Sequence, residues 1–174
     1  MIDENVRLSP AGLHDLPAIA ELAAKIWREH YPGIITHAQI DYMLARGYDI
    51  EVMRREIELE DIHYDLCIVG NETAGFISYG PGPQPGELKV HKLYLFGSYH
   101  GRGLGRLMLQ HALTYTAENG CHTVVLNVNK YNGKAIAMYK RNGFAIREAV
   151  MVDIGHGFVM DDYVMERRIE NCCR

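Results

Sequence analysis

The feature that most constrains the fold is a glycine-rich turn between an apolar run and a helical pattern. The turn reads His-Gly-Arg-Gly-Leu-Gly-Arg and covers residues 100–106. An apolar run at 93–96 precedes it, and residues 107–117 continue with the pattern of a helix. Glycine lets backbone N–H groups approach an anion closely, and a helix N-terminus adds unpaired donors at the positive end of a dipole. The turn therefore predicts a site for a phosphate-bearing cofactor.

Three interpretations of this turn compete. A Walker P-loop requires GxxxxGK followed by Ser or Thr, and Gly133-Lys134 lacks both the upstream glycine and the hydroxyl residue. A dinucleotide fold requires GxGxxG after the first strand, whereas this turn has GxGxG spacing and follows a later apolar run. The spacing alone leaves a phosphate cradle and a plain connecting turn as alternatives.

The rest of the chain predicts a mixed α/β fold. Apolar residues at helical spacing predict helices over residues 13–29, 36–47, 50–59, 103–118 and 132–141. Short apolar runs bounded by Gly, Pro and Asn predict strands over residues 6–8, 63–69, 74–79, 88–96, 123–128, 144–152 and 159–169. Because strands alternate with helices only in the middle of the chain, we expect a mixed sheet with helices on both faces.

Length and composition predict a single domain with a core over about residues 6–169 and a tail at 170–174. The net charge of −4 argues against a broad basic face for nucleic acid. The N-terminus is neither basic nor apolar, and no run approaches the ~20 apolar residues of a membrane span, so we expect a cytoplasmic protein without a membrane partner. The four cysteines show no CxxC spacing, and no metal is expected.

Two motifs carry a family resemblance. Residues 93–105 resemble the acetyl-CoA motif of the GNAT N-acetyltransferase superfamily, in which Gln/Arg-x-x-Gly-x-Gly/Ala follows a strand ending in a pattern like Leu-Tyr-Val. Residues 132–144 resemble the family's Asn-x-x-Ala-x-x-x-Tyr-x-x-x-Gly-Phe. The order of elements from Val6 to Ile169 is similar to that of the family, which implies a twisted, mostly antiparallel sheet. One residue departs from the pattern, because His100 stands where Gln or Arg is usual.

The resemblance implies transfer of an acetyl group from acetyl-CoA to a primary amine of a small molecule or peptide, in a direct ternary complex. It implies that the cofactor is held by Leu93, Tyr94, Leu95, His100, Gly101, Arg102, Gly103, Leu104, Gly105, Arg106, Asn132, Ala135 and Tyr139. The backbone N–H groups of the turn would cradle the pyrophosphate, and the end of the strand would pair with the pantetheine arm. A GNAT-fold module that binds acyl-CoA without catalysis is the alternative, which the unusual His100 and the absence of a glutamate base on the preceding strand motivate.

Three residues are predicted to carry the chemistry. The backbone N–H of Leu95 would polarise the thioester carbonyl, and Tyr139 would protonate the leaving thiolate. A packed amphipathic tyrosine is the alternative reading of Tyr139. The family often places a glutamate base on the strand before the turn. Strand alternation here offers His91, which is equally explained as a histidine at the edge of the core.

The acceptor site is weakly encoded. Trp27 and Tyr31 flank a helix break where GNAT enzymes often build the acceptor wall. Asp153, with Asp161 and Asp162, would hold a cationic amine or be ordinary solvated charge. The N-terminal helices and the tail also vaguely resemble polyamine acetyltransferases. The sequence leaves a monomer and a homodimer open.

Overall fold

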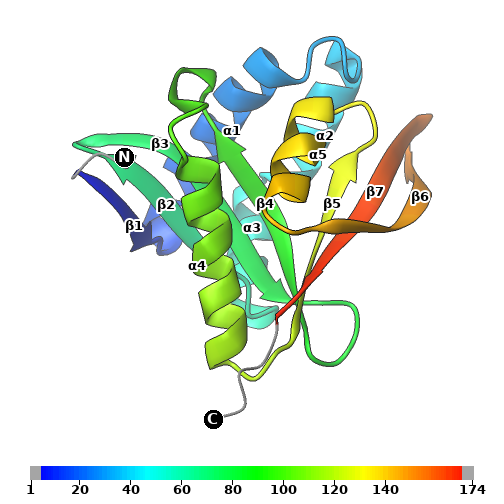
Figure 1. Ribbon diagram of the computed structural model, residues 1–174. Helices are drawn as coiled ribbons and strands as arrows, with labels where there is room; N and C mark the ends of the chain where they lie inside the picture. Colours follow the sequence, from blue (N-terminus) through cyan, green and yellow to red (C-terminus); the bar gives the residue numbers. More distant parts are fainter. Residues whose placement is uncertain (1–4, 170–174) are drawn as a thin grey trace. The chain divides into compact units, whose positions relative to one another are not determined.

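The computed structural model describes residues 5–169 and contains the expected order of elements (Figure 1). The strands are β1 (Val6–Pro10), β2 (His63–Val69), β3 (Glu72–Pro81), β4 (Glu87–Leu95), β5 (Thr123–Asn129), β6 (Ala145–Gly155) and β7 (Phe158–Arg168). The helices are α1 (Leu16–His30), α2 (His37–Gly47), α3 (Ile50–Leu59), α4 (Leu104–Glu118) and α5 (Gly133–Arg141), with short 3-10 turns η1 (Leu13–Asp15) and η2 (Gly97–Tyr99). No helix among these residues is long and apolar enough to span a membrane.

Local signals explain where the helices begin. The hydroxyl of Thr36 accepts a hydrogen bond from the N–H of Gln39 at 3.2 Å and caps α2. Asp49 caps α3 in the same way through the N–H groups of Glu51 and Val52. The first long helix starts at Leu16 rather than at residue 13, because a 3-10 turn precedes the proline in its first turn.

The hairpin between β2 and β3 is tighter than predicted. A loop over residues 70–73 was expected, but Glu72 and Thr73 pair with Val69 and Ile68. Gly70 has a φ of +61°, in the left-handed region that lets the chain reverse within two residues. Two more residues therefore join β3.

The strands are hydrogen-bonded in the order β1-β2-β3-β4-β5-β7-β6. The β1–β2, β2–β3, β5–β7 and β6–β7 pairings are antiparallel, whereas β4–β5 is parallel. The expected mixed, mostly antiparallel sheet is confirmed. The recorded β4–β5 pairs run from Glu87↔Thr123 to Val90↔Leu126, although both strands continue beyond these residues.

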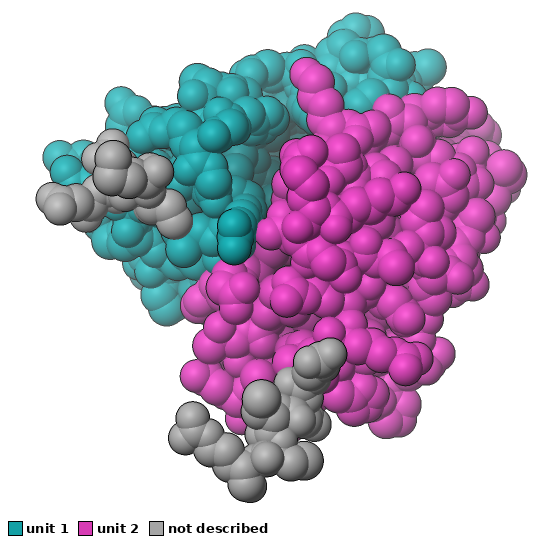
Figure 2. Space-filling view, in the orientation of Figure 1, with its two compact units in different colours: residues 1–80, 92–108 teal, residues 81–91, 109–174 magenta. Residues whose placement is uncertain are grey.

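The chain forms two compact units (Figure 2). Within the described residues, unit 1 holds residues 5–80 and 92–108, and unit 2 holds residues 81–91 and 109–169. Strand β4 and helix α4 each contribute residues to both units. The expectation of a single domain stays a prediction.

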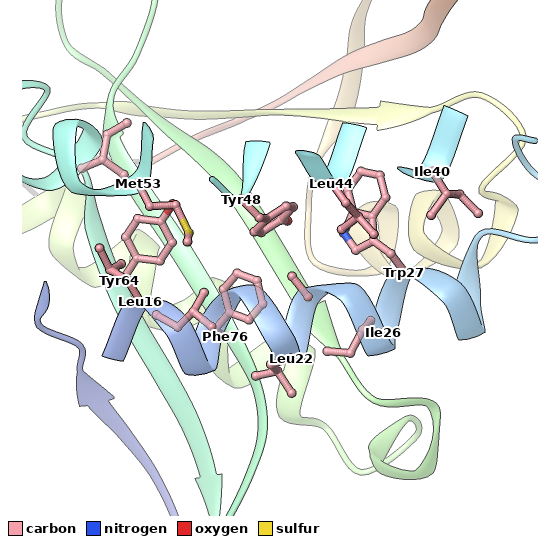
Figure 3. Close-up of a cluster of buried hydrophobic side chains, with 13 residues drawn as sticks. Leu16, Leu22, Ile26, Trp27, Ile40, Leu44, Tyr48, Met53, Tyr64 and Phe76 are labelled. Carbon is pink, nitrogen blue, oxygen red and sulfur yellow. The ribbon is translucent and has the colours of Figure 1, made fainter. Parts of the chain in front are cut away.

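The core of unit 1 is an apolar cluster between its three helices and two of its strands (Figure 3). Helix α1 buries a stripe at helical spacing, and α2, α3, β2 and β3 supply the facing side chains. The buried members include Leu16, Ile19, Ala23, Ile26, Trp27, Ile40, Leu44, Tyr48, Met53, Tyr64 and Phe76.

In unit 2, one face of the β5–β7 ladder is apolar. Val124, Leu126 and Met165 are buried there, and they share this face because paired strand residues point to the same side. Arg167 lies on it too, and its Nη1 donates to the carbonyl of Asn142 at the end of α5. Helix α5 therefore belongs to this apolar face.

Candidate active site

The glycine turn has the backbone geometry of an anion cradle. Gly101 and Gly103 have φ values of +77° and +81°, in the left-handed region, so the two positions require glycine for their conformation. Helix α4 follows at once, and its first bond runs from the N–H of Leu107 to the carbonyl of Gly103. The N–H groups of the first helical turn therefore have no acceptor within the helix.

The unusual histidine of the turn contacts the backbone of its own loop. His100 Nε2 lies 3.1 Å from the carbonyl oxygen of Leu95, at the end of β4. Its ring centroid is 6.4 Å from that of His30 on α1. The side chain that departs from the family pattern thus connects the turn with the end of the preceding strand.

The end of β4 is packed tightly against β3 in unit 1. The N–H of Phe96 donates to the carbonyl of Ala74 at 3.0 Å. A Cβ on Gly75 would lie 2.1 Å from the carbonyl oxygen of Tyr94, so only glycine allows this approach. The Tyr94 ring enters the aromatic cluster, 5.6 Å from Trp27. The ring of Tyr94 is therefore part of the apolar cluster, and its carbonyl faces β3.

The predicted aromatic acceptor wall is mainly core. Trp27 is buried, with its ring 4.5 Å from that of Tyr31 and 5.9 Å from that of Tyr48. Tyr31 is half-buried just after the end of α1. Only Tyr31 of the two predicted wall residues keeps substantial exposed surface.

A buried ionic cluster in unit 1 was not predicted. Lys92 Nζ on β4 lies 2.9 and 2.7 Å from the two carboxylate oxygens of Glu56 on α3, and 2.6 Å from the hydroxyl of Tyr64 on β2. The Tyr64 hydroxyl also donates to Glu56. Burial lowers the pKa of Lys92, and Glu56 opposes this shift. The sequence offered one sign of this cluster, a lysine within a predicted strand. Its partner Glu56 lies 36 residues away in the sequence, so the pairing could not be inferred.

The second motif lies in unit 2 and forms as predicted. The Oδ1 of Asn132 accepts from the N–H of Ala135 at 3.4 Å and caps α5. Tyr139 is 7% exposed, with its ring 6.0 Å from that of Phe144. Burial raises the pKa of Tyr139 to about 12, so its phenol holds a proton at neutral pH. That protonation state suits a general acid, and the packing equally fits the alternative of a core tyrosine.

The three aspartates of the closing strands differ in their surroundings. Asp153 is exposed and accepts from the N–H of Gly155 at 2.8 Å, within the turn between β6 and β7. Asp161 forms an ion pair with Lys130. Asp162 is 3% exposed, so the reading as ordinary solvated charge is wrong for this residue. Burial explains the difference, because Asp162 lies on the opposite face of β7 from Asp161.

The candidate base His91 and its strand neighbour Lys89 are both half-buried on β4. Burial lowers the pKa of Lys89, and the charge of Asp162 opposes this shift. Among residues 5–169, no three His, Cys, Asp or Glu side chains are grouped as metal ligands.

Comparison with known proteins identifies relatives of this chain. Residues 19–144 match the acetyltransferase (GNAT) family. The chain is 23% identical over 171 residues to the spermidine N(1)-acetyltransferase of Thermoplasma acidophilum, covering 96% of this chain and 99% of that protein. It is 26% identical over 160 residues to the L-methionine sulfoximine/L-methionine sulfone acetyltransferase of Pseudomonas aeruginosa, covering 85% of this chain and 84% of that protein.

Solved structures share the fold. The PaiA N-acetyltransferase of Thermoplasma acidophilum, crystallised in complex with coenzyme A, has a TM-score of 0.78 at 21% identity and covers 94% of this chain and 99% of its own. A GCN5-related N-acetyltransferase from Rhodopseudomonas palustris has a TM-score of 0.80 at 15% identity and covers 97% of this chain and 99% of its own.

Proposed function

Because the chain belongs to the acetyltransferase (GNAT) family, we propose that it moves an acetyl group from acetyl-CoA to a primary amine of a small molecule or peptide. The observation that carries this proposal is the turn before α4, where two left-handed glycines lead directly into the N-terminus of the helix. The coenzyme A in the PaiA structure supports the cofactor. The spermidine acetyltransferase relative supports an amine acceptor.

The cofactor would be held mainly by backbone groups. The N–H groups from Gly101 to Arg106 suit a pyrophosphate, and the exposed Arg102 and Arg106 add positive charge beside it. Pairing between β4 and β5 ends at Val90, so the backbone of Leu93 and Leu95 is suited to pair with the pantetheine arm as an added strand would.

The reaction then needs three groups of this chain. The amine nitrogen forms a bond to the thioester carbon while the carbon–sulfur bond breaks. The N–H of Leu95 stabilises the negative charge on the carbonyl oxygen, an effect worth about 10²–10³ in rate for one such donor. Tyr139 gives its proton to the departing thiolate, and His91 takes the proton that the amine loses.

The test is to mix the protein with acetyl-CoA and a panel of polyamines, amino acids, aminoglycosides and peptide N-termini, and to follow free thiol. We expect thiol release above background with at least one amine. Release with none of these acceptors would contradict the proposal. Protection by CoA against thermal unfolding without any turnover would instead support the non-catalytic module.

A further inference from the structure

The face of unit 2 opposite α5 carries a row of polar side chains. Lys89 pairs with Val125, which pairs with Glu166, so these residues point to one side. Steps of two residues bring Asn127 and Asp162 to the same side. A sheet face that places charged groups at its centre is suited to bind a polar ligand.

Most charges of this row already neutralise one another. Arg147 Nη2 lies 2.6 Å from Glu87, and its Nε lies 3.2 Å from Glu166. Asp162 stands apart from this network, with the positive charges of Lys89 and Lys130 near it. Among residues 5–169, it is the buried acid of the row that forms no ion pair with an arginine.

Asn127 connects this carboxylate with the surface. Burial raises the pKa of Asp162, and a hydrogen bond from the side chain of Asn127 opposes this shift, so the NH₂ group of Asn127 is the donor. The amide oxygen is then directed away from Asp162. Asn127 is exposed although its neighbours Leu126 and Val128 are buried, and it is the first residue of β5 beyond the recorded β4–β5 pairs.

We propose that Asn127 and Asp162 form the binding site for the acceptor amine in its cationic form, a proposal that rests on the proposed function. The Asn127 oxygen accepts a hydrogen bond from the ammonium group, which releases one proton to solvent before its nitrogen attacks the thioester. Asp162 acts through Asn127 as a positioning residue, and its negative charge stabilises the cation. The same charge repels a carboxylate, so the site selects amines that carry no carboxylate beside the nitrogen.

The chain supplies a matched control for the test. Asp161 and Asp162 are adjacent in sequence, but Asp161 points to the opposite face and pairs with Lys130. We would measure KM for spermidine and for acetyl-CoA by thiol release, and spermidine binding by calorimetry with CoA present. D162N and N127A are expected to raise KM for spermidine at least about tenfold, with KM for acetyl-CoA within about twofold, an effect of the size of one charge-assisted hydrogen bond. D161N should change neither.

Several results would overturn the proposal. They are an unchanged spermidine KM in D162N and N127A, an equal rise in D161N, or glycine binding as tightly as n-butylamine. N127A keeps the test valid if D162N fails to fold, because Asn127 is exposed. A wild-type protein that binds neither spermidine nor n-butylamine would also refute it. If the wild type binds spermidine, N127A does not, and neither protein releases thiol, the proposed function is rejected and the binding site is retained.

Discussion

Replacing Lys92 by Met tests whether the buried ionic cluster of unit 1 stabilises the fold. The ammonium group lies within 2.9 Å of both Glu56 oxygens and 2.6 Å of the Tyr64 hydroxyl, and 5.1 Å from the centroid of the Tyr64 ring. The side chains of Lys92 and Glu56 are 10% and 16% exposed. Methionine fills a similar volume, so the substitution mainly removes the charge and its hydrogen bonds.

The expected loss follows from the carboxylate left behind. Removing one partner of a buried ion pair costs about 3–5 kcal/mol, since the remaining charge is desolvated without compensation. Glu56 keeps the Tyr64 hydroxyl and a little solvent, which places the loss near the lower end, at about 3 kcal/mol. For a protein of this size, about 2–4 °C of Tm correspond to 1 kcal/mol, so Tm should fall by about 6–12 °C.

The assay is urea and thermal unfolding of the wild type, K92M, E56L and the double variant. The double variant should recover most of the lost stability, because it buries no uncompensated charge. K25M is the control, since Lys25 pairs with Glu21 in the open on α1, and it should leave the unfolding midpoint unchanged. A loss below about 1 kcal/mol in K92M, or a double variant whose loss equals the sum of the single losses, would refute this reasoning.

Four further changes have defined outcomes. Y139F should lower kcat by about 100-fold with KM for acetyl-CoA unchanged, and equal turnover of the variant would reject the acid role. Because burial raises the pKa of Tyr139 to about 12, wild-type kcat should not fall between about pH 8 and 10 through loss of this proton. G103A should weaken CoA protection against thermal unfolding, as a left-handed alanine costs about 1–2 kcal/mol; undiminished protection would contradict the cradle. H100A should raise KM for acetyl-CoA about fivefold at constant kcat, reflecting one lost hydrogen bond; an unchanged KM would show that its bond to Leu95 is dispensable. G75A should lower Tm, because its Cβ would collide with the Tyr94 carbonyl; a Tm equal to that of the wild type would contradict this close approach.

Features set by neighbouring residues were predictable from the sequence. The bounds of α3 and β2 agree with the apolar spacing, and the turn glycines and the Asn132 cap follow from local backbone requirements. Each of these depends on a few consecutive residues. For that reason one sequence was enough to identify both motifs.

Features that depend on packing were not predictable. Asp161 and Asp162 are the same residue type in adjacent positions, yet only Asp162 is almost fully buried, because strand alternation turns the two to opposite faces. Trp27 was expected beside the acceptor and is core, since α1 turns it toward Tyr48 and Tyr94. Pairing between Lys92 and Glu56 joins a strand to a distant helix, which periodicity does not encode.

The path of β4 determines whether the two units can be expressed as separate fragments. Its residues 87–91 belong to unit 2 and residues 92–95 to unit 1, so neither unit is one continuous piece of chain. A gene fragment ending at residue 80 would leave out the segment that carries Lys92 and the glycine turn. A fragment starting at residue 109 would lack the parallel partner of β5. The two units therefore cannot be produced separately by simple truncation, and new chain ends are better introduced in the loop between β3 and β4.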